Sequence, residues 1–201
     1  MKGGAFHSCE YIEEIILPEG LTHIGGWTFA SCHALKKMIL PNSLTRIEAN
    51  IFYNCYSLQE ISVPYIGQLR DKRSDQPLYP FGYWFGQVNG SNVYQIQQRY
   101  YDEEDATGKR QTITGNFSIP YSLKKITVTG GEIPYGAFEN CSEVENIILS
   151  EGVTSIDTSV FYNCKKLTEM IIPNSVTYLG SSSLFYNCYD LEKVVYPNND
   201  S

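Results

Sequence analysis

Six cysteines and three histidines are the residues of this chain whose chemistry could support metal binding or nucleophilic catalysis. His7 lies close to Cys9, which would suit a pair of zinc ligands or a Cys–His nucleophile. The pair has no third partner around it in the sequence and does not recur elsewhere. The sequence also contains no P-loop, GxGxxG, GxSxG or CxxC motif. We therefore predict no catalytic residue, no metal site and no cofactor, and a protein that is not an enzyme.

The cysteines instead follow phenylalanines in a regular repeat of 23 residues. The pairs are Phe6/Cys9, Phe29/Cys32, Phe52/Cys55, Phe138/Cys141, Phe161/Cys164 and Phe185/Cys188, and the last interval is one residue longer. Because each cysteine occupies the same position of its repeat, the side chains should point in parallel into one core rather than toward each other. We expect free, buried thiols that act as small apolar residues, and not three disulfides.

Self-similarity at this period is typical of solenoids, in which each repeat buries its apolar face against its neighbours. In residues 35–41, apolar and polar side chains alternate as in a strand, and Pro41 ends the strand because it lacks an N–H. Seven segments fit this template: 11–17, 34–40, 57–63, 123–128, 143–149, 166–172 and 190–196. We expect them to stack in parallel as one continuous sheet, with one helical turn at most in each repeat.

The full pattern, L-x-x-I-x-[LI]-P-x-[SG]-[VL]-T-x-I-x-x-x-x-F-x-x-C, resembles the BspA-like leucine-rich repeat family over residues 1–64 and 123–201. The resemblance implies a right-handed curved solenoid, rich in strand and poor in helix, with the strands on its concave side. It also implies a secreted or cell-surface protein of host-associated bacteria that is involved in adhesion, with no catalytic residue. Intracellular members in protists leave the compartment open.

Residues 65–122 break the period and form an aromatic-rich insertion within what we take to be one continuous solenoid domain. Segments 92–99 and 110–119 are predicted to be the arms of a β-hairpin, with its tip at 102–108. The acidic run 102–105 could bind calcium, but it lacks the ligand spacing of an EF-hand loop and favours a solvated tip. Tyrosine with Ser, Gly and Asn is typical of recognition loops. The candidate residues are Tyr83, Trp84, Tyr100 and Tyr101; alternatively, Trp84 and its neighbours form a small core.

Outward positions of the seven strands form two columns, one of mixed charge and one mostly β-branched. These candidate partner-binding residues are Glu14, Ile16, Lys37, Ile39, Glu60, Ser62, Lys125, Thr127, Asn146, Ile148, Glu169, Ile171, Lys193 and Val195. The columns could simply reflect strand propensity and solubilising charge. The alternative is an apolar stripe with a charged border, which would suit a protein partner.

The formal net charge is −7 at pH 7, and the acidic excess lies on the repeats. An acidic surface disfavours nucleic acids and anionic membranes. No apolar run approaches the roughly 20 residues of a membrane span. No signal peptide is visible, and both ends fall within a repeat and lack a polar cap. This favours a fragment of a longer array, and it leaves end-to-end contacts through the uncapped repeats open.

Three functions from different classes remain after these exclusions. The sequence favours a surface-displayed, adhesion-type module that binds a host or matrix protein. A glycan-binding module that uses the tyrosines and tryptophan of the insertion is the first alternative. The second is a structural spacer within a larger surface protein.

Overall fold

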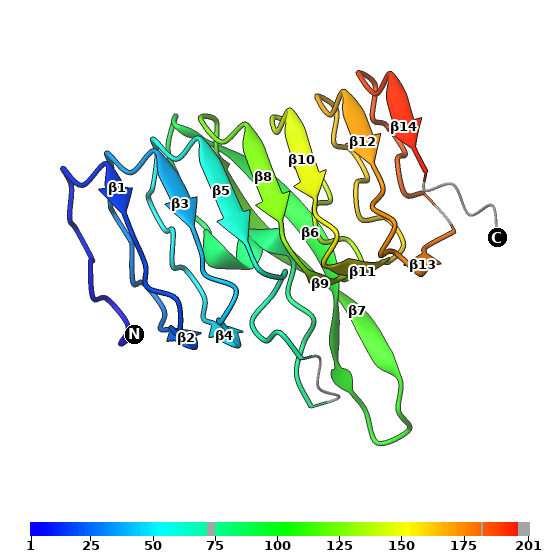
Figure 1. Cartoon of the computed structure of the whole chain (residues 1–201), viewed down its shortest axis with the longest axis horizontal. Coiled ribbons are helices and arrows are strands. Elements are labelled where there is room, and N and C mark those ends of the chain that lie inside the picture. The colour runs from blue at the N-terminus through cyan, green and yellow to red at the C-terminus, as the bar shows by residue number, and fades with distance from the viewer. Residues whose placement is uncertain (72–74, 182, 197–201) are drawn as a thin grey trace.

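Stacked coils of short parallel strands form one solenoid along the chain (Figure 1). The computed structural model describes residues 1–71, 75–181 and 183–196. Seven strands line one side of the coils, and each falls inside a segment that the repeat template predicts. They are β1 (Glu14–Ile15), β3 (Lys37–Ile39), β5 (Glu60–Val63), β8 (Lys125–Val128), β10 (Asn146–Leu149), β12 (Glu169–Ile171) and β14 (Lys193–Val195). The predicted solenoid fold is confirmed.

The phenylalanine and cysteine columns run through the core. The rings of Phe29 and Phe52 stack with centroids 5.7 Å apart, and the same contact recurs from coil to coil. Four of the thiols, those of Cys32, Cys55, Cys164 and Cys188, donate to the phenylalanine carbonyl of the preceding coil, as Cys55 Sγ does to Phe29 O at 3.1 Å. All six cysteines are free and four are fully buried, as the sequence predicted. Burial raises the pKa of Cys55 and Cys164, so these thiols stay protonated and serve as packing groups.

The seven strands do not form the single continuous sheet that we predicted. β1, β3, β5, β8 and β10 form a five-stranded parallel sheet, whereas β12 and β14 pair separately. The structure describes every residue of β10 and β12, and these neighbouring strands share no backbone ladder. The coils remain hydrogen-bonded on the opposite side, where Phe138 N–H donates to Val160 O at 3.0 Å. The rings of Phe138 and Phe161 also stack, with centroids 6.0 Å apart, so the core is continuous although the two strands do not pair.

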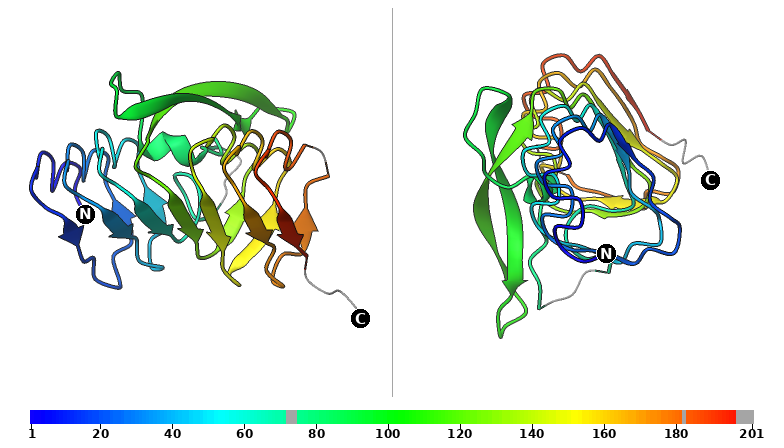
Figure 2. Two further views of the ribbon diagram at one scale, coloured as in Figure 1. Left: turned by 90° about the horizontal axis from the view of Figure 1, so that it is seen from above. Right: turned by 90° about the vertical axis from the view of Figure 1, so that its left-hand side faces the viewer.

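A second row of shorter strands forms the neighbouring side of the coils. β2 (His23–Ile24) pairs with β4 (Arg46–Ile47). β9 (Gly131–Ile133), β11 (Val153–Ile156) and β13 (Tyr178–Leu179) form a three-stranded parallel sheet. Seen along the solenoid axis, the coils enclose a roughly three-sided core (Figure 2).

The insertion completes one coil before it leaves the solenoid. β5 pairs directly with β8 in parallel register, so the insertion does not interrupt the five-stranded sheet. The short 3-10 helix η1 (Phe81–Trp84) and the residue that follows it, Phe85, place two rings into the phenylalanine column. The ring centroid of Phe85 lies 5.6 Å from that of Phe52, and the centroid of Phe81 lies 5.4 Å from that of Phe138. The phenylalanine column therefore continues across the break in the sequence repeat.

The rest of the insertion is a hairpin of β6 (Val93–Glu104) and β7 (Arg110–Pro120). Its first arm is longer than predicted, because Tyr100 and Tyr101 continue the register opposite Ile113 and Thr112. The base of the hairpin lies against the outside of the coils, and its distal end projects beyond them (Figures 1 and 2). Helix content is low, in agreement with the sequence prediction.

Candidate functional site

The outward columns predicted from the sequence lie together on the solvent-exposed face of β1, β3, β5, β8, β10, β12 and β14. We call this surface the strand face. Alternate residues are buried in β3, β5, β8, β10 and β12 and partly buried in β1 and β14, so their neighbours must point outward. The five apolar β-branched side chains are exposed, from 37% for Val195 to 86% for Ile16. Solvent therefore reaches an apolar column that the strands hold in fixed positions.

Two polar residues divide this column into two apolar patches. Ser62 and Thr127 occupy neighbouring positions on β5 and β8, at the middle of the face. Toward the N-terminus, Ile16, Ile39, Leu17 and Pro41 line a shallow hollow of about 160 Å³. Toward the C-terminus, a hollow of about 340 Å³ lies where the ladder between β10 and β12 is missing. It is lined by Asn146, Ile147, Ile148, Leu149, Glu169 and Ile171.

Charged side chains run beside the apolar column and neutralise one another. Glu60 Oε2 lies 3.6 Å from Lys37 Nζ and 3.7 Å from Lys125 Nζ, so one carboxylate is shared by cations from both neighbouring strands. Glu169 and Lys193 form a further pair across β12 and β14. These pairs are solvent-exposed and add little to stability. The apolar patches are therefore bordered by glutamate and lysine side chains that already pair with one another.

The four candidate residues of the insertion separate in the structure. Trp84 is fully buried, with its ring 5.7 Å from that of Phe81, so it cannot be part of an exposed platform. The alternative reading, in which Trp84 belongs to a core, is the correct one. Tyr83 and Tyr100 are half-buried on one side of the hairpin, where both contact Tyr79. Tyr101 stacks on Tyr135, with ring centroids 4.8 Å apart.

A buried polar network that sequence reasoning missed fixes the hairpin on the coils. Gln98 is fully buried and donates through Nε2 to the carbonyls of Ala137 and Glu139, at 3.1 and 3.0 Å. The carboxylate of Glu139 accepts from the backbone and side chain of Arg99, including a 2.8 Å contact with Nη2. Glu139 stands where three other repeats have tyrosine, and this departure from the repeat was the available signal.

The guanidinium of Arg99 is also placed by aromatic rings. It lies 5.5 Å from the ring centroid of Tyr135 and 5.4 Å from that of Tyr162. The hydrogen bond to Glu139 raises the pKa of Arg99, with a smaller electrostatic contribution from both tyrosines. This cation is therefore held by the protein itself and anchors the hairpin.

At the acidic tip of the hairpin, the carboxylate of Asp105 accepts hydrogen bonds from residues of the same turn. Asp105 Oδ1 accepts from the backbone and hydroxyl of Thr107 and from Lys109 N–H, which closes the turn. These bonds, above all the one from the Thr107 hydroxyl, lower the pKa of Asp105. Across residues 1–71, 75–181 and 183–196, no three side chains of the metal-ligating types gather in one place.

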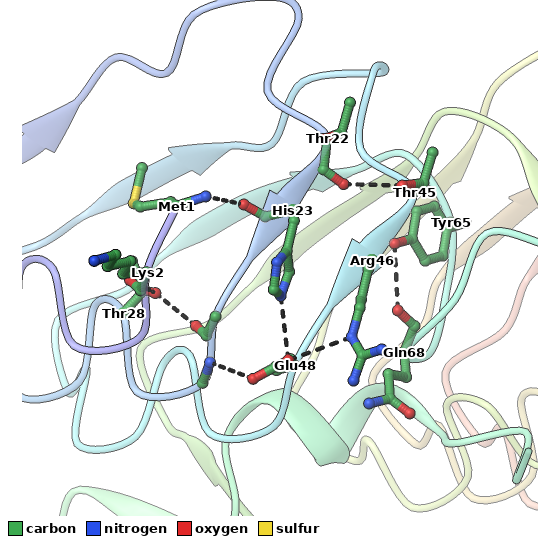
Figure 3. Close-up of polar contacts among 12 residues, drawn as sticks. Met1, Lys2, Thr22, His23, Thr28, Thr45, Arg46, Glu48, Tyr65 and Gln68 are labelled. Carbon is green, nitrogen blue, oxygen red and sulfur yellow. Dashed lines mark hydrogen bonds and ion pairs between the residues drawn. The ribbon is translucent and has the colours of Figure 1, made fainter.

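The three histidines lie apart and have separate partners. His7 contacts the hydroxyl of Ser8, and His33 stacks on the ring of Tyr56. His23 contacts Glu48, with Nε2 and Oε1 3.2 Å apart (Figure 3). None of these contacts places a histidine beside a cysteine thiol, as a catalytic pair would require.

Glu48 connects neighbouring coils in the cluster that Figure 3 shows. Its carboxylate accepts from Gly26 N–H at 3.1 Å and contacts Arg46 Nε at 3.3 Å, in addition to His23. The Gly26 hydrogen bond, followed by the His23 contacts, lowers the pKa of Glu48 despite some burial. Because the folded pKa is below the unfolded one, this stabilising contribution is present above the ordinary glutamate pKa and is lost as pH falls. The cluster therefore has a structural role.

Comparison with known proteins agrees with this geometry. The model of the BspA type leucine rich repeat region matches residues 1–71 and 112–201 in six copies. The fold is similar to a leucine-rich repeat protein from Bacteroides ovatus, with 20% identity and a TM-score of 0.54 over 98% of this chain and 40% of that one. A leucine rich cell surface protein from Faecalibacterium prausnitzii is 18% identical, with a TM-score of 0.33 over 99% of this chain and 63% of that one.

This chain thus spans 40% of the length of the Bacteroides ovatus protein. No curated protein sequence matches it. The part of the chain that the structure describes has no helix with the length and apolar character of a bilayer span. Because the repeat model covers most of the sequence, the chain belongs to the BspA-type leucine-rich repeat family.

Proposed function

We propose that this chain is a non-enzymatic, adhesion-type protein-binding module that is displayed at a cell surface and binds its partner through the strand face. Leucine-rich repeat proteins are generally binding modules, and proteins of the BspA-like family are bacterial surface proteins. The observation that carries the proposal is the exposed β-branched column, which β-strands hold in place beside paired charges.

The physics of such a face suits a protein partner. Each exposed isoleucine offers apolar surface whose burial is favourable by about 25 cal/mol per Å². The side chains stand on backbone that is already ordered, so binding costs little additional conformational entropy. The neighbouring Glu–Lys pairs satisfy one another and can remain at the rim of an interface without leaving an unpaired charge.

Binding of the purified chain to immobilised matrix proteins, such as fibronectin, laminin and collagen, tests this proposal. Ile171→Asp places a charge in the C-terminal apolar patch, and we expect it to weaken binding by about tenfold or more. Tyr189→Asp is the matched control, because Tyr189 is 70% exposed and lies outside the strand face. Equal binding by the two variants would show that the strand face is not the interface.

Surface display is tested separately on intact cells that carry the natural protein. Protease treatment of whole cells should remove the epitopes of this chain while a cytoplasmic marker stays intact. Protection of the chain until the cells are lysed would contradict surface display. If neither matrix proteins nor glycans are bound in purified form, the spacer alternative is favoured instead.

A further inference from the structure

The hairpin and the β9–β11–β13 sheet meet at a corner on the outside of the solenoid. In Figures 1 and 2 the distal part of the hairpin extends past the side of the coils on which this sheet lies. The sheet forms a floor and the hairpin stands beside it as a wall. Tyr101 of the hairpin joins the two parts, because its ring stacks on Tyr135 just beyond β9.

The floor of the corner is polar throughout. A groove of about 460 Å³ is lined by Glu132, Thr154, Ser155, Asp157, Thr177 and Tyr178. Four of these six side chains carry hydroxyls and two carry carboxylates. Asp157 Oδ1 accepts from Thr158 N–H at 2.6 Å, which fixes the carboxylate at the end of β11. Tyr178 is 56% exposed at the edge strand, so its ring is available to a ligand.

The wall adds side chains of the same chemistry. Tyr101 pairs with Thr112 across the hairpin, and Arg99 pairs with Thr114 two residues further along. Directly opposed residues of an antiparallel pair share one face, so these four side chains lie on the same face of the hairpin. Arg99 reaches the rings of Tyr135 and Tyr162, which shows that this face is turned toward the C-terminal coils.

Beside the ring of Tyr135, the hairpin contributes the phenol of Tyr101 to the corner. Burial raises the pKa of this phenol, and Asp157, Tyr135 and Tyr178 raise it further. The phenol therefore stays protonated at neutral pH and can donate a hydrogen bond. The corner thus combines two tyrosine rings, several hydroxyls and two carboxylates, of which that of Asp157 is fixed by Thr158 N–H. This composition is very different from the isoleucines of the strand face.

We propose that this corner is a binding site for an uncharged oligosaccharide, in which the rings of Tyr101 and Tyr178 contact sugar C–H faces while Asp157 and the threonine and serine hydroxyls bind sugar hydroxyls. Carboxylates accept well from hydroxyl donors, and a few converging polar groups beside an aromatic ring give orientation. Two carboxylates in the groove disfavour sialylated or sulfated glycans. No side chain of the groove is aliphatic, so it does not match an apolar peptide segment.

This inference goes beyond the proposed protein-binding function and uses a different surface. It also differs from the platform expected from the sequence, because Trp84 takes no part and the floor comes from the repeats. The two proposals can therefore fail independently.

An array of neutral mannose-, galactose-, xylose- and N-acetylglucosamine-containing oligosaccharides, with sialylated and sulfated members, tests the inference. We expect the chain to bind a class of neutral oligosaccharides. The best-bound array member is then titrated by calorimetry. Tyr178→Ala and Asp157→Asn should each weaken its binding by about tenfold, since each removes a ring or a charged acceptor. Asparagine retains an oxygen for Thr158 N–H, so this variant should fold.

Two variants serve as controls in the same titration. Tyr189→Ala removes an exposed tyrosine that belongs neither to the groove nor to the hairpin, and Ile171→Asp disrupts the strand face. Both variants should bind the oligosaccharide as the unaltered chain does. The inference is overturned if no neutral oligosaccharide binds, or if only anionic glycans bind. It is also overturned if Tyr178→Ala and Asp157→Asn bind as tightly as Tyr189→Ala.

Discussion

The repeat coils and the insertion are stabilised in different ways. In the coils, the contacts of the core belong to rows: phenylalanine on phenylalanine, thiol to carbonyl, and strand beside strand. The insertion is held by contacts that occur once, chiefly Gln98 with the backbone of the following coil and Glu139 with Arg99. Rows distribute the stability over many similar units, whereas the insertion depends on a few buried polar groups.

The asparagine row shows that the two halves of the solenoid also differ. Asn163 donates to Asn140 Oδ1 at 2.7 Å and accepts from Asn187 Nδ2 at 2.9 Å, so the amides link three coils. The N-terminal coils carry Ser8 and Ser31 at the same position. Both residue types adopt positive φ there, but only asparagine has the amide needed for a ladder. Equivalent positions of a repeat thus share backbone shape without sharing their contacts.

The largest effect is expected from the phenylalanine column. Phe52→Ala removes a fully buried ring between Phe29 and Phe85, and it should lower the free energy of unfolding by roughly 3–5 kcal/mol. Phe161→Ala should cost a similar amount, because Phe161 has ring neighbours on both sides. Chemical denaturation measures both. A much smaller loss for one of the two would show that the row is not uniform, and an unchanged melting temperature would contradict the buried position of Phe52.

Removal of the single negative charge of Glu139 should clearly destabilise the packing of the insertion on the coils. Glu139→Gln leaves Arg99 without its anionic partner next to a buried network, and we expect a loss of about 1–3 kcal/mol. Faster hydrogen exchange should be confined mainly to β6 and β7. If exchange rose equally in all coils while the hairpin stayed protected, the network would not be what anchors the hairpin.

The asparagine ladder should contribute less. Asn163→Gly keeps the positive φ without strain and removes two amide contacts, so we expect a loss of roughly 1 kcal/mol. Ser31→Gly is the matched change in the other half and should be close to neutral. Equal losses at the two positions, measured by urea denaturation, would argue against the ladder as the source.

The smallest effect is expected on the strand face. Glu60→Gln makes the same chemical change as Glu139→Gln, but in an exposed pair with Lys37 and Lys125. The cost should be no more than about 1 kcal/mol and should shrink further at high salt. A loss as large as that of Glu139→Gln would remove the distinction between row contacts and single contacts that the comparison rests on.

Sequence reasoning was accurate for the side-chain rows of the core and for where the strands lie. The buried thiols, the inward phenylalanines and the positions of all seven strands followed from one repeat pattern. It was wrong about one continuous sheet, because the ladder between β10 and β12 is missing although both segments fit the same repeat pattern. It could not assign Trp84, whose surroundings come from a segment without a repeat.

The 23-residue pattern alone determined the solenoid, since each repeated side chain meets its own equivalent in the next coil and one repeat describes all of its neighbours. Only the tertiary structure decided which residues of the insertion enter the core and which turn outward. Tyr101 meets Tyr135, and Gln98 meets Ala137, across dozens of residues that carry no common period. The corner beside β9, β11 and β13 exists because the hairpin returns to these coils, and a contact made once leaves no periodic trace in a single sequence.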